Sequence, residues 1–125
     1  MREEDKNLLM IDLCSRLPYG VKVEAETWLE DEGEFAYVPD KVYSINSDGY
    51  IVHGYDEVYE CKPYLFPLSS MTEEQKEEFD RLYTYDALII YPQWELIDWL
   101  NKNHFDYRGL IEKGLAIDAT NKNIY

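Results

Sequence analysis

The hydrophobic residues near the N-terminus recur at helical spacing. Within residues 3–17 they form one apolar stripe of Leu9, Met10, Leu13, Cys14 and Leu17. A stripe at this spacing is typical of a helix that packs one face against a core. Acidic residues open the segment, where the helix dipole favours anions, and Pro18 ends it. We therefore predict a helix over residues 3–17, with the Cys14 thiol buried and unreactive.

The following segment alternates between apolar and polar positions. In residues 21–29 the odd positions are mostly apolar and the even positions polar, apart from Trp28. This alternation indicates a strand with one buried face. Further extended segments are expected at residues 35–38, 41–45, 50–55 and 58–62, with a bend or bulge at residues 39–40 and a hairpin turn at residues 46–49. The front half is thus predicted to be a helix followed by an antiparallel meander of three or four strands.

Proline governs the interpretation of the next segment. Pro63 and Pro67 indicate that residues 62–71 form an extended connection over the sheet edge, because proline cannot donate to the hydrogen-bond ladder of a central strand. Thr72 followed by Gln75 has the pattern of a capping box. A second helix is therefore predicted from Thr72 to about residue 83.

The C-terminal third contains one more clear helical pattern. Pro92 fits the first turn of a third helix that ends near residue 103. Residues 86–91, which contain the apolar run 87–91, fit either a strand or the buried start of that helix. Asp106 is expected to cap a short helical turn over residues 107–113, and residues 119–125 are expected to fray.

Together these elements predict an α+β fold in a single domain of residues 1–125. It has an N-terminal helix, an antiparallel sheet of three to five strands, and two or three C-terminal helices packed on one sheet face. The chain length is close to the commonest domain size, and no Gly/Ser-rich linker divides it.

The net charge narrows the classes of partner. The chain carries 26 acidic and 12 basic residues, a net charge of −14. Direct binding to nucleic acid or to an anionic membrane is disfavoured, because both require a basic face. The acidic surface either only keeps the chain in solution or attracts a basic partner protein.

Localisation and cofactors follow from what the sequence lacks. There is no apolar leader at the N-terminus and no run of about 20 apolar residues, so we expect a cytoplasmic protein with two free thiols. The sequence has no phosphate-binding loop, nucleotide-binding fingerprint or cluster of His and Cys, so no cofactor and no metal are expected.

The strand region contains the candidate binding residues. Trp28 lies on the polar face of its predicted strand, where it is either covered by the chain's own loops or left as an exposed anchor. The remaining candidates are the two acids on that strand face and three tyrosines of the meander: Glu24, Glu26, Tyr37, Tyr43 and Tyr50. They form a tyrosine-rich face beside the acids, unless the rings pack against the helices instead.

The segment after the third helix holds the weak catalytic candidates. His104, Asp106 and Arg108 could act as base, orienting acid and anion clamp if they shared a pocket. The structural alternative is a histidine at a helix C-terminus, a capping aspartate and a bracing arginine.

Several blocks of the sequence resemble a known family. They are Leu-Pro-Tyr-Gly-Val at 17–21, Lys-Pro-Tyr-Leu at 62–65, Pro-Leu-Ser-Ser-Met-Thr-Glu-Glu at 67–74, Asp-Trp-Leu-Asn at 98–101 and His-Phe-Asp-Tyr-Arg-Gly-Leu-Ile-Glu-Lys-Gly-Leu-Ala at 104–116. The family comprises small uncharacterised proteins from genomes, prophages and phages of anaerobic gut bacteria, and no activity is attached to it. The resemblance implies a bacterial or phage cytoplasmic accessory protein whose specific contacts lie in residues 22–60.

The leading hypothesis is therefore a non-catalytic interaction protein of phage or mobile-element origin, one version of which is an acidic inhibitor of a basic partner. One alternative is a small-molecule-binding protein or enzyme that uses His104, Asp106 and Arg108. Another is a structural subunit of a larger assembly. The sequence leaves the oligomeric state and the identity of the protein partner open.

Overall fold

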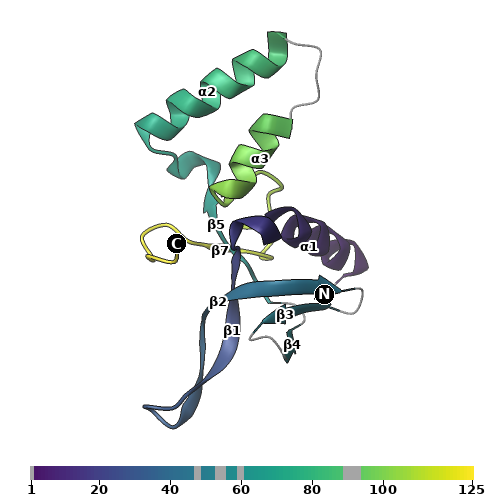
Figure 1. The fold of residues 1–125 in the computed structure, drawn as a ribbon, viewed down its shortest axis with the longest axis vertical. Helices are drawn as coiled ribbons and strands as arrows, with labels where there is room; N and C mark the ends of the chain where they lie inside the picture. Colours follow the sequence, from purple (N-terminus) through teal and green to yellow (C-terminus); the bar gives the residue numbers. More distant parts are fainter. Residues whose placement is uncertain (1, 47–48, 53–55, 59–60, 89–93) are drawn as a thin grey trace.

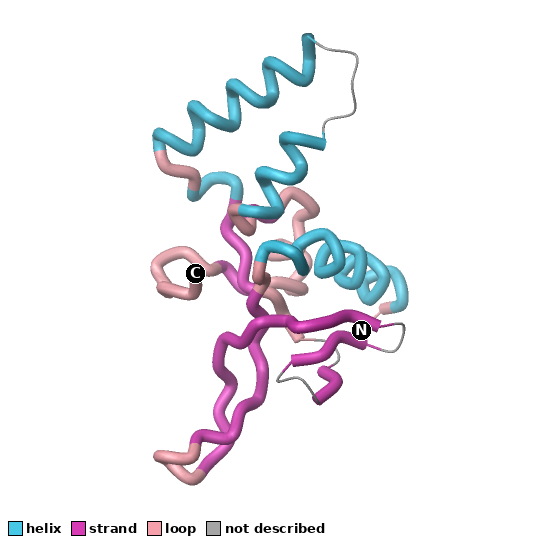
Figure 2. Tube along the Cα trace, viewed as in Figure 1, coloured by secondary structure: helices cyan, strands magenta, loops and turns pink. Residues whose placement is uncertain are grey.

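The computed structural model describes residues 2–46, 49–52, 56–58, 61–88 and 94–125. The helices are α1 (Glu3–Arg16), α2 (Glu73–Leu88) and α3 (Trp94–Lys102), with short 3₁₀ turns η1 (Leu17–Tyr19) and η2 (Leu68–Ser70). The strands are β1 (Lys22–Leu29), β2 (Glu34–Asn46), β3 (Gly49–Val52), β4 (Asp56–Val58), β5 (Tyr64–Pro67), β6 (Phe105–Asp106) and β7 (Ile117–Asp118). Figures 1 and 2 show their arrangement, which confirms the predicted α+β class.

The front half forms the predicted antiparallel meander, with strand order β1-β2-β3-β4. No bulge interrupts the strand at residues 39–40, because β2 pairs with β1 continuously from Glu34 to Lys41. The strand does bend, since β2 changes direction between the part paired with β1 and the part paired with β3 (Figures 1 and 2). Among the strands that the structure describes, this part of β2 pairs with β1 alone, so the missing N–H of Pro39 is tolerated. The irregularity lies slightly later, between Val42 and Ser44. The strands β2 and β3 meet at Asn46 and Gly49, and the two residues between them lie outside the described ranges.

A second sheet corrects the prediction for residues 62–71. These residues contain β5, which is the central strand of a parallel three-stranded sheet with order β6-β5-β7. Proline does not prevent this, because Pro63 precedes the strand and Pro67 ends it. The residues between them supply the ladder: Phe66 N donates to His104 O at 2.8 Å, and Leu65 O accepts from Ala119 N at 2.8 Å.

The main hydrophobic core lies between α1, β1, β5 and the segment before β7. Its fully buried members include Leu13, Val21, Val23, Val42, Leu65 and Leu110. The face of α1 that packs on this core carries Leu9, Asp12, Leu13 and Arg16. The prediction for Cys14 is therefore wrong, since its side chain is exposed. Compared with the predicted apolar stripe, the buried face of α1 is rotated so that it includes Asp12 and Arg16, which form an ion pair.

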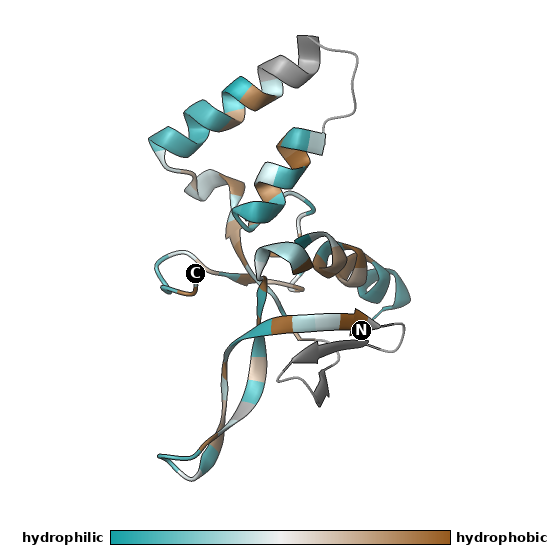
Figure 3. Cartoon of the chain, viewed as in Figure 1, coloured by the Kyte–Doolittle hydropathy of each residue, from teal (hydrophilic) through white to brown (hydrophobic). Residues whose placement is uncertain are grey.

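The C-terminal helices pack in a different place from the one predicted. A second cluster of Leu82, Leu96, Leu100 and Phe105 joins α2 and α3 to each other and to β6. They thus cover the small parallel sheet, at the opposite end of the molecule from the β1–β2 hairpin, and not a face of the meander (Figure 1). The α2 helix is hydrophilic along most of its length (Figure 3).

The capping box at the start of α2 is confirmed. Thr72 N donates to Gln75 Oε1 at 2.9 Å, and Gln75 N donates to Thr72 Oγ1 at 3.1 Å. The helix continues past the predicted end at residue 83 to Leu88, so residues 86–88 are helical. Residues 89–91 lie outside the described ranges.

The C-terminal segment is packed, whereas the sequence predicts that residues 119–125 fray. Ile124 is buried, and its carbonyl accepts a hydrogen bond from Lys22 Nζ at 2.8 Å. The hydroxyl of Tyr125 accepts from Lys22 N at 2.9 Å and donates to Tyr64 O at 2.8 Å. These contacts hold the end of the chain against the start of β1 and β5.

Candidate protein-binding surface

The distal parts of β1 and β2 form a two-stranded ribbon that projects from the rest of the molecule (Figures 1 and 2). Side chains alternate between the two faces of a strand, and directly paired residues of antiparallel strands share a face. One face turns inward and carries the buried Val23 and Ala25. We call the other the outer face; the cross-strand register gives it Lys22 with Lys41, Glu24 with Pro39, Glu26 with Tyr37, and Trp28 with Phe35.

The outer face is rich in exposed aromatic rings. The exposed fractions are 50% for Trp28, 62% for Phe35 and 70% for Tyr37. Trp28 and Phe35 contact each other edge to face, with ring centroids 4.9 Å apart and planes at 66°. Tyr43, 58% exposed, lies beyond the stretch of β2 that pairs with β1, and Lys41 Nζ is 5.9 Å from its ring centroid. Single exposed rings are ordinary, but three exposed rings at neighbouring positions of one face, Trp28, Phe35 and Tyr37, are typical of a binding surface.

The ribbon is also strongly acidic. Between residues 24 and 40 every charged side chain is a carboxylate: Glu24, Glu26, Glu30, Asp31, Glu32, Glu34 and Asp40. A shallow pocket at the tip is lined by residues 28–32, from Trp28 to Glu32. Aromatic rings and negative charge therefore occur together along the whole projecting part of the ribbon.

The base of the outer face is covered by the C-terminal segment. The Lys22 side chain is bonded to the Ile124 carbonyl, and its ammonium lies 6.0 Å from the centre of the Tyr125 ring. Accessible surface on this face thus begins beyond Lys22 and extends to the tip.

The structure brings together most of the predicted binding residues. Glu24, Glu26, Trp28 and Tyr37 share the outer face, and Trp28 takes the exposed alternative. The backbone of Tyr50 pairs with Ile45 in the meander, but its side chain lies outside the described parts.

Sequence reasoning missed Phe35. The polar turn at residues 30–33 could have predicted its position, because a hairpin closed by that turn pairs Phe35 directly with Trp28. Recognition of the register would have placed both rings on one face.

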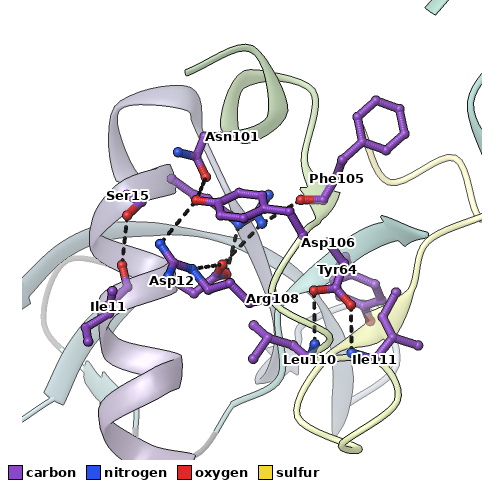
Figure 4. A network of polar contacts seen from close by, with 12 residues as sticks. Ile11, Asp12, Ser15, Tyr64, Asn101, Phe105, Asp106, Arg108, Leu110 and Ile111 are labelled. Atoms are coloured by element: carbon purple, nitrogen blue, oxygen red, sulfur yellow. Dashed lines mark hydrogen bonds and ion pairs between the residues drawn. The ribbon is translucent and has the colours of Figure 1, made fainter. Parts of the chain in front are cut away.

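The three catalytic candidates do not converge on a shared pocket. Asp106 has the predicted capping role: its two carboxylate oxygens accept from Leu110 N and Ile111 N, each at 2.9 Å (Figure 4). The capped segment forms turns, however, and not the predicted short helix. Both oxygens of Asp106 are thus engaged in holding the backbone.

Arg108 belongs to a separate network with α1 (Figure 4). Its Nε donates to Asp12 Oδ1 at 3.2 Å, while the buried Arg16 donates to Asp12 Oδ2 at 2.8 Å and to Phe105 O at 2.6 Å. The ring of Tyr107 contacts both guanidinium groups, with its centroid 5.2 Å from Arg16 Cζ and 4.9 Å from Arg108 Cζ. This network ties α1 to the segment after α3.

His104 is buried against the C-terminal residue. Its ring stacks on Tyr125 with centroids 3.7 Å apart, and its backbone has a φ of 60°. Burial, reinforced by the charges of Arg16 and Lys22, lowers the pKa of His104 to about 4. The imidazole is therefore neutral at pH 7. Burial also raises the pKa of Tyr125 to about 12. His104, Asp106 and Arg108 thus have three separate structural roles.

Other kinds of site receive no support from the described part of the chain. Its His, Cys, Asp and Glu side chains form no group of three or more that could hold a metal ion. None of its helices combines the length and apolar character needed to cross a bilayer.

Comparison with known proteins identifies no family. No family model, curated protein or solved structure matches the chain. The resemblance to small proteins of gut bacteria and their phages therefore stays a prediction.

Proposed function

We propose that this chain is a non-catalytic interaction protein that binds a partner protein through the outer face of the β1–β2 ribbon. The observation that carries the proposal is the group of exposed rings on this projecting element, formed by Trp28, Phe35 and Tyr37. Exposed aromatic side chains are the residues that most often dominate binding energy at protein interfaces.

These rings add little to the stability of the isolated chain. Half or more of each ring remains in water, so the rings contribute little of the burial that stabilises a fold. A partner that covered them would remove that surface from water. Because the backbone of the ribbon is already paired and Trp28 already rests on Phe35, little conformational freedom is lost on binding.

The proposed context is a bacterial or phage cytoplasm, where the chain acts as an accessory of a phage or mobile element. Its support is the sequence resemblance, which leaves residues 22–60 outside the shared blocks. The ribbon lies within those residues. The resemblance thus implies a shared scaffold that displays a variable ribbon, as partner-specific binding would require.

The alternatives are separated by what they require of the structure. An enzyme built on His104, Asp106 and Arg108 needs the three side chains in one pocket, and their separate partners do not favour it. A structural subunit of a larger assembly would associate with itself or with an obligate partner, and a measurement of molar mass by light scattering detects the self-association.

The deciding experiment is an affinity capture from lysate of the source organism with quantitative mass spectrometry. Wild-type chain is compared with a Trp28→Ser/Tyr37→Ser variant. The matched control is Tyr83→Ser/Trp94→Ser, because these rings on α2 and α3 are 54% and 55% exposed. We expect a protein that is captured by the wild type and the control but lost with the ribbon variant. Equal capture of every protein by all three chains would overturn the proposal.

A further inference from the structure

We infer that the partner presents arginine side chains to the outer face, where guanidinium groups stack on the exposed rings and pair with the neighbouring carboxylates. This inference rests on the proposed function and specifies the chemistry of the partner. It depends on how rings and carboxylates are interleaved along β1 and β2.

The cross-strand pairs place the two kinds of group side by side. Glu26 is paired with Tyr37, and the next pair towards the tip is Trp28 with Phe35. Successive pairs on one face are about 7 Å apart, because each residue of a strand advances roughly 3.4 Å. A guanidinium that lies over one of these rings can therefore reach a carboxylate of the adjacent pair.

The charge on this face lacks a counterpart within the described chain. Among the described residues no basic side chain pairs with Glu24 or Glu26. The two basic residues of the ribbon, Lys22 and Lys41, form its last cross-strand pair, and the Lys22 ammonium donates to the Ile124 carbonyl. A basic partner would supply the missing positive charge, whereas nucleic acid would be repelled.

The core of this same chain contains the arrangement that we infer for the complex. There one tyrosine ring, Tyr107, and one carboxylate, Asp12, together hold two guanidinium groups. The outer face offers the same two groups, with Tyr37 beside Glu26, without a guanidinium between them. Arginine suits this site better than lysine, because its planar group can stack on a ring and donate to a carboxylate at the same time.

The test uses purified full-length chain and fluorescent peptides of defined composition. The probes are nona-arginine and nona-lysine, titrated at about 0.15 M salt and followed by fluorescence anisotropy. We expect nona-arginine to bind about tenfold more tightly than nona-lysine, since stacking favours the guanidinium. Equal affinity for the two peptides would overturn the inference.

Substitutions separate the outer face from net charge. Glu24→Gln/Glu26→Gln should weaken nona-arginine binding about tenfold, through two lost carboxylate contacts. The matched control is Glu74→Gln/Glu77→Gln, which removes the same charge from exposed positions of α2 and should change affinity by less than about twofold. An equal effect of the two double variants would show that only net charge attracts the peptide, and would overturn the inference.

The rings are tested separately. Trp28→Ser/Tyr37→Ser should also weaken nona-arginine binding about tenfold while leaving nona-lysine binding within about twofold. Far-UV circular dichroism checks that each double variant is folded. Folding is expected because none of the substituted side chains is buried. If the peptide tests fail while the lysate partner is still lost with the ring variant, the proposed function stands and the arginine chemistry is wrong.

Discussion

The buried charge network between α1 and the segment after α3 offers a sharp test of how this fold is held together. Asp12 and Arg16 are both completely buried, and Arg16 also donates to the carbonyl of Phe105. We consider Arg16→Met, which keeps an unbranched apolar stem but removes the charge and every donor. Asp12 then keeps only Arg108, whose side chain is 25% exposed.

The expected loss follows from the contacts. Leaving a buried charge without its partner typically costs about 3–5 kcal/mol. Arg108 still compensates part of the Asp12 charge, so the cost lies at the lower end of this range. The Phe105 carbonyl, which loses its donor, adds about 1 kcal/mol. Arg16→Met should therefore lower the free energy of unfolding by roughly 3–4 kcal/mol. The companion variant Asp12→Leu/Arg16→Met removes both charges and should lose only about 1–2 kcal/mol.

Urea unfolding at pH 7, followed by circular dichroism, measures both variants against the wild type. With a denaturant slope of about 2 kcal/mol/M, the single variant shifts the midpoint by roughly 1.5–2 M. The decisive result is the order of the two variants, because the double variant should be the more stable by about 2 kcal/mol. A double variant as unstable as the single one would refute the reasoning, since the cost would then lie in packing and not in an uncompensated charge.

Four further predictions concern individual side chains. His104 is neutral in the fold and titrates near its ordinary pKa when unfolded, so the free energy of unfolding falls as pH drops from about 6.5 towards 4. Between pH 7 and 5 the wild type should therefore lose about 2 kcal/mol more of this free energy than His104→Asn. Parallel pH profiles of the two proteins in urea unfolding would contradict this. Asp106→Ala leaves two backbone N–H groups unpaired and should cost about 2 kcal/mol in the same assay, with Asp106→Asn losing about half as much because it keeps one acceptor oxygen. Tyr125→Phe removes a hydroxyl bonded to two backbone groups and should lower the free energy of unfolding by about 1–2 kcal/mol, which a lower thermal midpoint reveals. An unchanged midpoint would mean that the C-terminal segment is not held there. The exposed Cys14 should react with a disulfide reagent in the native protein faster than the half-buried Cys61, and a Cys14 that reacts only after unfolding would be the contrary result.

Elements that depend on short stretches of sequence were predicted well. Spacing of apolar residues predicted α1, and the alternation in residues 21–29 predicted both β1 and which of its faces is buried. The capping box predicted the start of α2 within one residue, since Thr72 caps a helix that begins at Glu73. In each case the interaction that decides the element lies within a few positions of the chain, so the sequence contains the whole cause.

Predictions failed where a distant part of the chain supplies the deciding contact. The buried face of α1 includes Asp12 and Arg16 because Phe105, far along the chain, accepts a hydrogen bond from Arg16. The strand β5 is central because both its neighbours come from the C-terminal third of the chain.

The candidate site shows the same division. The sequence alone determined the charge of the ribbon and the positions of Trp28, Glu24, Glu26 and Tyr37 along it. It also determined the alternation that puts the first three on one face. Only the tertiary structure decided that this face stays uncovered, that Phe35 joins it, and that His104, Asp106 and Arg108 point to separate partners. The physical reason is that periodicity sets which side of an element a residue occupies, whereas exposure depends on what the rest of the chain packs against that side.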